Sequence, residues 1–333
     1  MNASPISWHP AQRLSVAPMM DWTDRHCRAF HRVLAPDARL YTEMVHAQAV
    51  RHGDRERLLG FDPSEHPLAL QLGGSDPTLL AEASRIGEQW GYDEVNLNVG
   101  CPSDRVQAGR FGACLMKEPA VVADCIAAML AAVRIPVTVK CRLGVDEQED
   151  YPPFLAFIDT VAATGCRNFI VHARKAWLSG LSPKENRDIP PLRYDWVHRL
   201  KLDRPQLTIV LNGGLDTVEA SLAQLELVDG VMLGRTAYHD PYRLHLLDCA
   251  LSQRTVQPRE ALMHAYLPYV ARQLEAGVAL KHITRHVLGL FHAQPGGRAF
   301  RQILSEGAPK SEAGIELLET ALAVTRAPLG NVA

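Results

Sequence analysis

Short apolar runs that end on polar or glycine residues recur along the first 240 residues. In the run 94–101, Val95, Leu97 and Val99 alternate with Asn96 and Asn98, as they would in a β-strand, and Gly100 and Pro102 follow. Seven other runs have this form: 15–19, 40–45, 67–74, 137–144, 169–176, 208–214 and 230–238. The pattern therefore predicts eight strands.

Segments with helical spacing lie between these runs, at 24–34, 78–90, 120–133, 153–164, 196–200 and 217–225. Eight alternating strands and helices over roughly 240 residues predict an α/β fold of the (β/α)8 TIM-barrel type. A doubly wound open sheet is the alternative. Such a sheet normally opens with a glycine-rich turn after the first strand, where this chain has Ala17-Pro18-Met19-Met20-Asp21.

The strand rhythm ends after about Leu244. The segments 259–275, 280–292, 297–306 and 312–325 have amphipathic helical spacing and are separated by glycine and proline. We therefore predict a barrel domain at residues 1–245 and an all-α domain at residues 246–333.

The composition restricts the cellular setting. The formal net charge of −2 gives no sign of a polyanionic partner. Seven cysteines without any C-x-x-C pair argue against a disulfide framework and against a zinc or iron–sulfur site, so we expect no metal and a reducing compartment. The sequence shows neither a signal-peptide core nor an apolar run of membrane length, so we expect a cytoplasmic protein without a membrane partner.

Active sites of such barrels form at the carboxyl ends of the strands, so the residues there are candidates for chemistry. In chain order these candidates are Ala17, Pro18, Met19, Glu43, Gln71, Asn98, Cys101, Lys140, Arg142, His172, Arg174, Asn212, Gly213, Gly214, Gly234 and Arg235.

The last two strand ends predict a phosphate site. Glycine-rich turns at Gly213-Gly214 and Gly234 expose backbone N–H groups, and Arg235 adds a guanidinium. A phosphate-bearing cofactor or substrate is expected there.

Lys140 and Gln71 suggest a flavin. A lysine inside a barrel mouth needs an anionic partner, because burying an ammonium alone is costly. The N1–C2=O edge of a reduced flavin is such a partner, and His172 could share it. The amide of Gln71 can both donate to and accept from a uracil-like ring edge.

Cys101 stands at a strand end between Gly100 and Pro102 and is our candidate acid. A thiol with an ordinary pKa of about 8.5 is mostly protonated at neutral pH and can donate that proton. We expect the other six cysteines to be buried and inert.

Together these motifs resemble the tRNA-dihydrouridine synthases. They are Ala17-Pro18-Met19, Gln71-Leu72-Gly73-Gly74, Asn98-Val99-Gly100-Cys101-Pro102-Ser103, Val139-Lys140, His172-Ala173-Arg174, Asn212-Gly213-Gly214 and Gly234-Arg235. The segments 172–178 and 181–187 resemble the A subfamily, which reduces uridines 20 and 20a. The likeness implies FMN on Ala17, Pro18, Met19, Gln71, Lys140, His172, Asn212–Gly214 and Gly234–Arg235. It also implies NADPH as reductant, Cys101 as catalytic acid and Asn98 as a uracil or ribose contact.

Two basic groups predict how a net-acidic chain holds tRNA. No Asp or Glu occurs from Ala276 to Ser305, where Arg298 and Arg301 share a helix face. The second group, after the sixth strand, is Arg174, Lys175, Lys184 and Arg187. Two such patches flanking the mouth could hold RNA phosphates while the uridine is extruded.

Two other functions fit parts of the sequence. A dihydroorotate- or dihydropyrimidine-type dehydrogenase also combines an FMN barrel with a cysteine, but it does not account for the basic helical domain. A non-catalytic RNA-binding barrel would have no reason to keep Cys101, Lys140 and the phosphate site together. We expect a monomer without an obligate protein partner.

Overall fold

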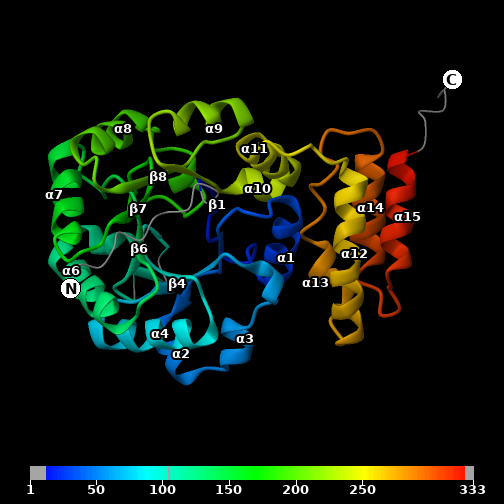
Figure 1. Ribbon diagram of the computed structural model, residues 1–333, viewed down its shortest axis with the longest axis horizontal. Helices are drawn as coiled ribbons and strands as arrows, with labels where there is room; N and C mark the ends of the chain where they lie inside the picture. The colour runs from blue at the N-terminus through cyan, green and yellow to red at the C-terminus, as the bar shows by residue number, and fades with distance from the viewer. Residues whose placement is uncertain (1–12, 104–105, 108, 327–333) are drawn as a thin grey trace.

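The computed structural model describes residues 13–103, 106–107 and 109–326, and it confirms the predicted barrel (Figure 1). Its parallel strands follow the ring order β1-β9-β8-β7-β6-β5-β4-β2, with β3 also paired to β4, and a bridge between Ser15 and Arg39 closes the ring. The strands are β1 Leu14–Val16, β2 Leu40–Tyr41, β3 Val45–His46, β4 Leu68–Gly73, β5 Glu94–Val99, β6 Val137–Cys141, β7 Asn168–His172, β8 Thr208–Asn212 and β9 Gly230–Leu233.

The predicted second strand is split into β2 and β3. Between them the hydroxyl of Thr42 accepts the N–H of Gln71 at 3.0 Å, where a backbone carbonyl would accept in a regular ladder. The same hydroxyl donates to the carbonyl of Glu43 at 2.7 Å. Because the Thr42 side chain replaces a backbone acceptor, the strand is interrupted there, but the chain on both sides of Thr42 still pairs with β4.

Alternation along each strand separates the core into two parts. Val95, Leu97 and Val99 of β5 join the large core between the strands and the surrounding helices. Residues of the opposite parity point into the barrel, where a small apolar cluster holds Ala17, Tyr41, Ala69, Ile170, Val210 and Met232. The polar positions of β4, β5 and β6 therefore also face the barrel interior.

Helices cover the outside of the barrel (Figure 1). The predicted ones are α1 Arg25–Leu34, α4 Pro77–Trp90, α6 Pro119–Ala132, α7 Tyr151–Ala162, α8 Tyr194–Asp203 and α9 Val218–Leu225. Their starts follow the local sequence: Asp24, Asp76 and Thr217 cap α1, α4 and α9 through their side chains. Two short helices that we did not predict, α2 Ala47–His52 and α3 Arg55–Leu59, follow β3.

The C-terminal helices are α10 Arg235–His239, α11 Pro241–Ser252, α12 Arg259–Glu275, α13 Leu280–Thr284, α14 Gly297–Gly307 and α15 Glu316–Arg326. Of these helices, α10 and α11 lie against the barrel beside α1, and α12 to α15 gather on the far side of α1 (Figure 1). Helix α11 packs on α1 and α9, so the predicted boundary at residues 245 and 246 falls inside a helix that contacts the barrel. The predicted domain ends, 1–12 and 327–333, lie outside the described residues.

The predicted helix 280–292 is wrong in length, because α13 ends at Thr284 and turns follow it. A side chain at Gly289 would lie 2.5 Å from the carbonyl oxygen of His239, so the chain there passes close to the backbone at the end of α10. Across the described ranges, no helix is both long and apolar enough to cross a membrane.

A buried hydrogen bond joins the helical part to the loop that follows β1. His286 donates from Nε2 to the carboxylate of Asp24 at 2.9 Å, and its side chain is fully buried. The carboxylate also accepts the N–H groups of His26 and Cys27, which caps α1. Beside this pair, the rings of Trp22 and Tyr238 stack at 4.6 Å. The helical part is thus attached to the loop that carries Ala17, Pro18 and Met19.

We predict that Asp24→Ala destabilises the protein by about 2–4 kcal/mol. The substitution removes a helix cap, about 1 kcal/mol, and leaves a buried imidazole unpaired, about 1–3 kcal/mol more. The measurement is equilibrium unfolding in urea. Asp54→Ala is the matched control, because Asp54 caps α3 at an exposed position and accepts only the N–H of Arg57. Equal losses in the two variants would show that the Asp24–His286 pair contributes nothing.

Candidate active site

The predicted strand-end side chains come together at one end of the barrel. Asn98 of β5 lies in register with Lys140 of β6, and His172 of β7 lies in register with Asn212 of β8. Because paired residues of neighbouring parallel strands point to the same face, these side chains form one inward-facing layer at the carboxyl ends. Cys101 follows the same end of β5.

Several hydrogen bonds hold the Cys101 turn. The Oδ1 atom of Asn98 accepts the N–H groups of Gly100 and Cys101, both at 3.0 Å. The carbonyl of Cys101 accepts the N–H of Ala113 at 2.9 Å. The thiol is half-buried and lies 3.6 Å from the hydroxyl of Ser103. The sulfur is therefore fixed at the barrel mouth but still accessible.

Asn98 and Gln71 are bonded to each other inside the mouth. Asn98 donates from Nδ2 to Oε1 of Gln71 at 2.9 Å, and Gln71 donates from Nε2 to Oδ1 of Asn96 at 2.8 Å. Gln71 is only 1% exposed. Each of these two amides has one N–H that is not used in these bonds. This N–H is available for the predicted contact of Gln71 with a flavin and of Asn98 with a uridine.

Lys140 is a half-buried cation without a hydrogen-bond or ion-pair partner among the described side chains. Burial, and then the charge of Arg142, lower the pKa of Lys140 to about 8. Burial, and then Arg142 and Lys140, hold the pKa of His172 well below its ordinary value, so this imidazole is neutral at neutral pH. Both residues are suited to bind a group that brings negative charge or acceptor atoms.

Arg142, directly after β6, has a larger role than the sequence suggested. Its guanidinium donates to three carbonyls: Gly100 at 2.9 Å, Lys175 at 3.0 Å and Asn186 at 2.9 Å. Burial lowers its pKa to about 10, and Cys101 is close enough to interact with it electrostatically. Arg142 thereby ties the Cys101 turn to the loop after β7. Its inward position after Lys140 was readable from strand alternation, but its three carbonyl partners were not.

The glycine turns after β8 and β9 differ in their surroundings. Gly213 and Gly214 have φ values of 108° and 66°, and a side chain at Gly213 would lie 2.6 Å from Cδ2 of His172. Gly234 has open space where a side chain would point. Arg235 pairs with Asp188 at 2.6 Å, a partner in the loop after β7 that we did not predict.

The four basic residues of that loop have different environments. Arg174 donates to the carbonyls of Pro190 and Asp188, and Lys175 pairs with Glu149 and lies 4.1 Å over the ring of Trp177. Arg187 is half-buried, and its Nε atom has no hydrogen-bond partner among the described residues. Lys184 is exposed. Arg174 and Lys175 thus support the loop, whereas Arg187 and Lys184 keep free donors.

The remaining predicted site residues are where the sequence placed them. Ala17 follows β1 and donates its N–H to the carbonyl of Leu233 at 2.8 Å, with Pro18 and Met19 half-buried after it. Asn212 donates from Nδ2 to the carbonyl of Met232 at 2.8 Å. Arg298 and Arg301 are exposed on α14 and have no carboxylate partner in the described part of the chain.

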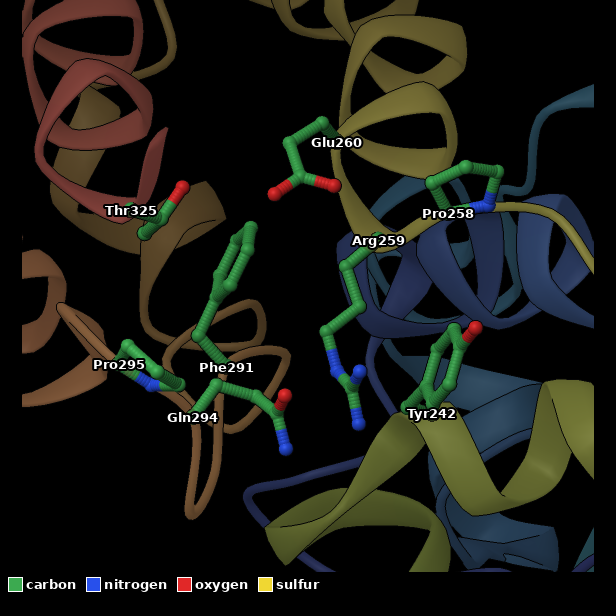
Figure 2. A pocket seen from close by; sticks show the side chains of 8 residues that line it. All are labelled: Tyr242, Pro258, Arg259, Glu260, Phe291, Gln294, Pro295 and Thr325. Carbon is green, nitrogen blue, oxygen red and sulfur yellow. The ribbon is translucent and has the colours of Figure 1, made fainter. Parts of the chain in front are cut away.

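A separate cavity of about 260 Å³ lies between α11, the start of α12 and the segment before α14 (Figure 2). Arg259 stacks 3.7 Å over the ring of Tyr242 and donates to the carbonyl of Leu290 at 2.9 Å. None of the residues predicted from the sequence lines this cavity. It is therefore distinct from the barrel mouth.

The residues of the mouth fit a phosphate-bearing flavin. Lys140 and Arg187 offer positive charge without a carboxylate partner, and the open space at Gly234 leaves room for a phosphate near backbone N–H groups. The apolar residues Ala17 and Met19 lie at the other side of the mouth, as a planar ring requires.

Comparisons with known proteins agree with this geometry. A solved structure of a morphinone reductase mutant superimposes with a TM-score of 0.52 over 72% of this chain and 87% of that one, at 10% identity, which shows the fold alone. A protein named tRNA-dihydrouridine(20/20a) synthase from Xanthomonas axonopodis pv. citri is 69% identical over 97% of this chain and 96% of its own length. Proteins with the same name are 57% identical in Shewanella oneidensis, over 92% of both chains, and 55% identical in Synechocystis, over 95% of both chains. The family model described as Dihydrouridine synthase (Dus) matches residues 15–326. The chain therefore belongs to the dihydrouridine synthase family.

Proposed function

We propose that this protein reduces uridines 20 and 20a of tRNA to 5,6-dihydrouridine, with FMN as cofactor and NADPH as electron donor. The observation that carries the proposal is the accessible Cys101 thiol beside the Lys140 cation at the mouth of a dihydrouridine synthase barrel. The positions follow the names of relatives that are 55–69% identical. Relatives with these names also disfavour a dehydrogenase of free pyrimidines.

The proposed cofactor contacts follow from the donors at the mouth. Lys140 and His172 would hold the polar edge of the ring, and Ala17, Pro18 and Met19 would contact its apolar part. Gln71 has one N–H left for it. The turns at Asn212–Gly214 and Gly234 would bind the phosphate together with Arg235, which must then share its guanidinium with Asp188.

When bound, a reduced flavin would supply the hydride for C6 of uracil. The chain's own contribution is a proton for C5, which Cys101 donates from its thiol. Arg142 and Arg187 are close enough to Cys101 to interact with it electrostatically. Both can stabilise the negative charge that develops on the uracil carbonyl oxygens and on the thiolate left behind.

The remaining proposals concern the setting. Arg187 and Lys184 near the mouth, and Arg298 and Arg301 on α14, are proposed tRNA contacts, with Arg174 and Lys175 positioning the loop between them. All seven cysteines are free, which suits the reducing cytoplasm. Nothing in the proposed reaction requires more than one copy of the chain.

We predict that Cys101→Ala lowers turnover with tRNA by about 10²–10⁴-fold, the usual contribution of a general acid. FMN content and reduction of the bound flavin by NADPH should stay unchanged, because neither needs the thiol. Dihydrouridine mapping by sequencing and absorbance of the flavin measure these effects. Cys114→Ala is the control, since Cys114 is the other half-buried cysteine. Full turnover in Cys101→Ala would exclude the thiol as the acid.

FMN affinity should fall as the pH rises above about 8, the pKa of Lys140 in the free protein. An anionic or acceptor edge of the flavin binds the Lys140 ammonium better than the neutral amine, so binding raises the pKa of Lys140. FMN affinity is therefore constant below the pKa of the free protein. It declines between this pKa and the higher pKa of Lys140 in the complex. Quenching of FMN fluorescence between pH 7 and 10 measures the dissociation constant. The Lys140→Met variant should bind FMN weakly, and its affinity should not decline over this pH range. Lys184 is exposed, so the Lys184→Met variant should show the same pH dependence as the wild type.

The double reversal Arg298→Glu and Arg301→Glu should weaken tRNA binding at least about tenfold and reduce its salt dependence by about one unit of slope per lost phosphate contact. FMN content should not change. A gel-shift titration at several salt concentrations provides the measurement. The matched control reverses Arg85 and Arg134, which are exposed on the barrel flank. If both doubles bind tRNA like the wild type, α14 is not part of the tRNA surface.

A further inference from the structure

A chain of buried polar side chains runs up one side of the barrel interior to the Cys101 turn. Glu94, at the start of β5, accepts hydrogen bonds from the hydroxyls of Tyr41 at 2.8 Å and Thr138 at 2.6 Å. Asn96 donates from Nδ2 to the Thr138 hydroxyl at 2.8 Å and accepts from Gln71 at 2.8 Å. Asn98 then follows, as described above. We call Glu94, Thr138, Asn96, Gln71 and Asn98 the polar ladder.

The carboxylate of Glu94 determines the direction of every bond in the polar ladder. Thr138 gives its one proton to Glu94, so toward Asn96 it can only accept. Asn96 must therefore point its NH₂ at Thr138 and its oxygen at Gln71. Gln71 in turn points its oxygen at Asn98. Each amide has one orientation that satisfies both neighbours.

The upper end of the polar ladder requires the same direction. Asn98 must present its oxygen to the turn, because the backbone N–H groups of Gly100 and Cys101 can only donate. The two ends are thus compatible only with this arrangement of amides. Reversing one amide would leave a buried donor facing a donor, which costs about 1–3 kcal/mol.

Packing alone does not require such a ladder. The opposite side of the same interior is filled by apolar residues of β7, β8 and β9, namely Ile170, Val210 and Met232. Barrel interiors are commonly filled with such branched side chains, and a buried polar network adds specificity of position more than it adds stability. The polar half lies on β4, β5 and β6, the strands that carry Gln71, Cys101 and Lys140.

We propose that Asn96 and Thr138 are positioning residues for Cys101. Through Gln71 they orient the Asn98 oxygen that holds the Cys101 turn, and so they set the position from which the thiol donates its proton. The turnover part of this inference rests on the proposed function. The positional part concerns only the thiol and the ladder.

The test uses the full-length protein loaded with FMN and two uncharged substitutions. Thr138→Val keeps the shape and removes the hydroxyl, and Asn96→Leu removes both amide contacts. Turnover per bound flavin at saturating tRNA should fall about threefold to tenfold in Thr138→Val. In Asn96→Leu it should fall more than tenfold, because misplacing a reacting group has large effects. KM for tRNA should stay close to the wild type, and turnover is expressed per bound flavin because Gln71 is also a proposed FMN contact. Thr138→Ser, which keeps the hydroxyl, should restore turnover.

A second readout does not depend on tRNA. Alkylation of Cys101 by iodoacetamide, followed by peptide mass spectrometry, should be several-fold faster in Thr138→Val and Asn96→Leu, because the turn is less restrained. Cys114 in the same sample is the internal reference, and Asn168→Leu, at the start of β7 and outside the ladder, is the control variant.

The outcomes separate the two proposals. If Thr138→Val folds, keeps its FMN and shows wild-type turnover and alkylation, the positioning role is overturned. Thr138→Val alone tests the proposal if Asn96→Leu does not fold. A purely structural role would lower stability or FMN content and leave turnover per flavin and alkylation unchanged. If the wild type itself does not reduce tRNA, the proposed function fails, and the alkylation rates still test the ladder.

Discussion

Closure of the barrel is the constraint on which the rest of this structure depends. The pairing of β1 with β9 and the bridge from Ser15 to Arg39 join the first strand to both of its neighbours. Once the ring is closed, alternate residues of every strand must point inward, and the carboxyl ends of all strands meet around one opening. Side chains more than 100 residues apart in sequence, such as Asn98 and Asn212, thereby come to surround a single site.

The opening carries positive charge that the protein itself leaves largely unbalanced. Lys140 has no partner among the described residues, Arg142 is bonded to carbonyls, and His172 is kept neutral. The carboxylate of Asp188 pairs with Arg235 at the rim. Burying cations without partners is costly, and the cost is recovered when an anionic group binds. Such a site is therefore more compatible with a phosphate-bearing cofactor and an electron-rich base than with a neutral ligand.

The helical part is attached where it affects this opening. Its buried His286 is bonded to Asp24, and Asp24 caps α1 directly after the loop that carries Ala17, Pro18 and Met19. Tyr238, from the helix that begins with Arg235, stacks on Trp22 of the same loop. The helical part, which carries the proposed tRNA contacts of α14, is thus joined through buried contacts to the loop after β1 and to the helix that follows β9.

The sequence by itself determined the strand order in the chain, the inward parity of the strands and the candidate residues at their ends, because alternation and glycine turns are local properties. It also placed α12 correctly at Arg259–Glu275. Tertiary structure alone decided the split of the second strand at Thr42, the short α13 beside Gly289, the carbonyl partners of Arg142 and the pairing of Arg235 with Asp188. It also decided that Asn98 holds the Cys101 turn through its oxygen. These features depend on contacts between residues that are far apart in the sequence, and the local pattern of apolar and polar residues does not determine such contacts.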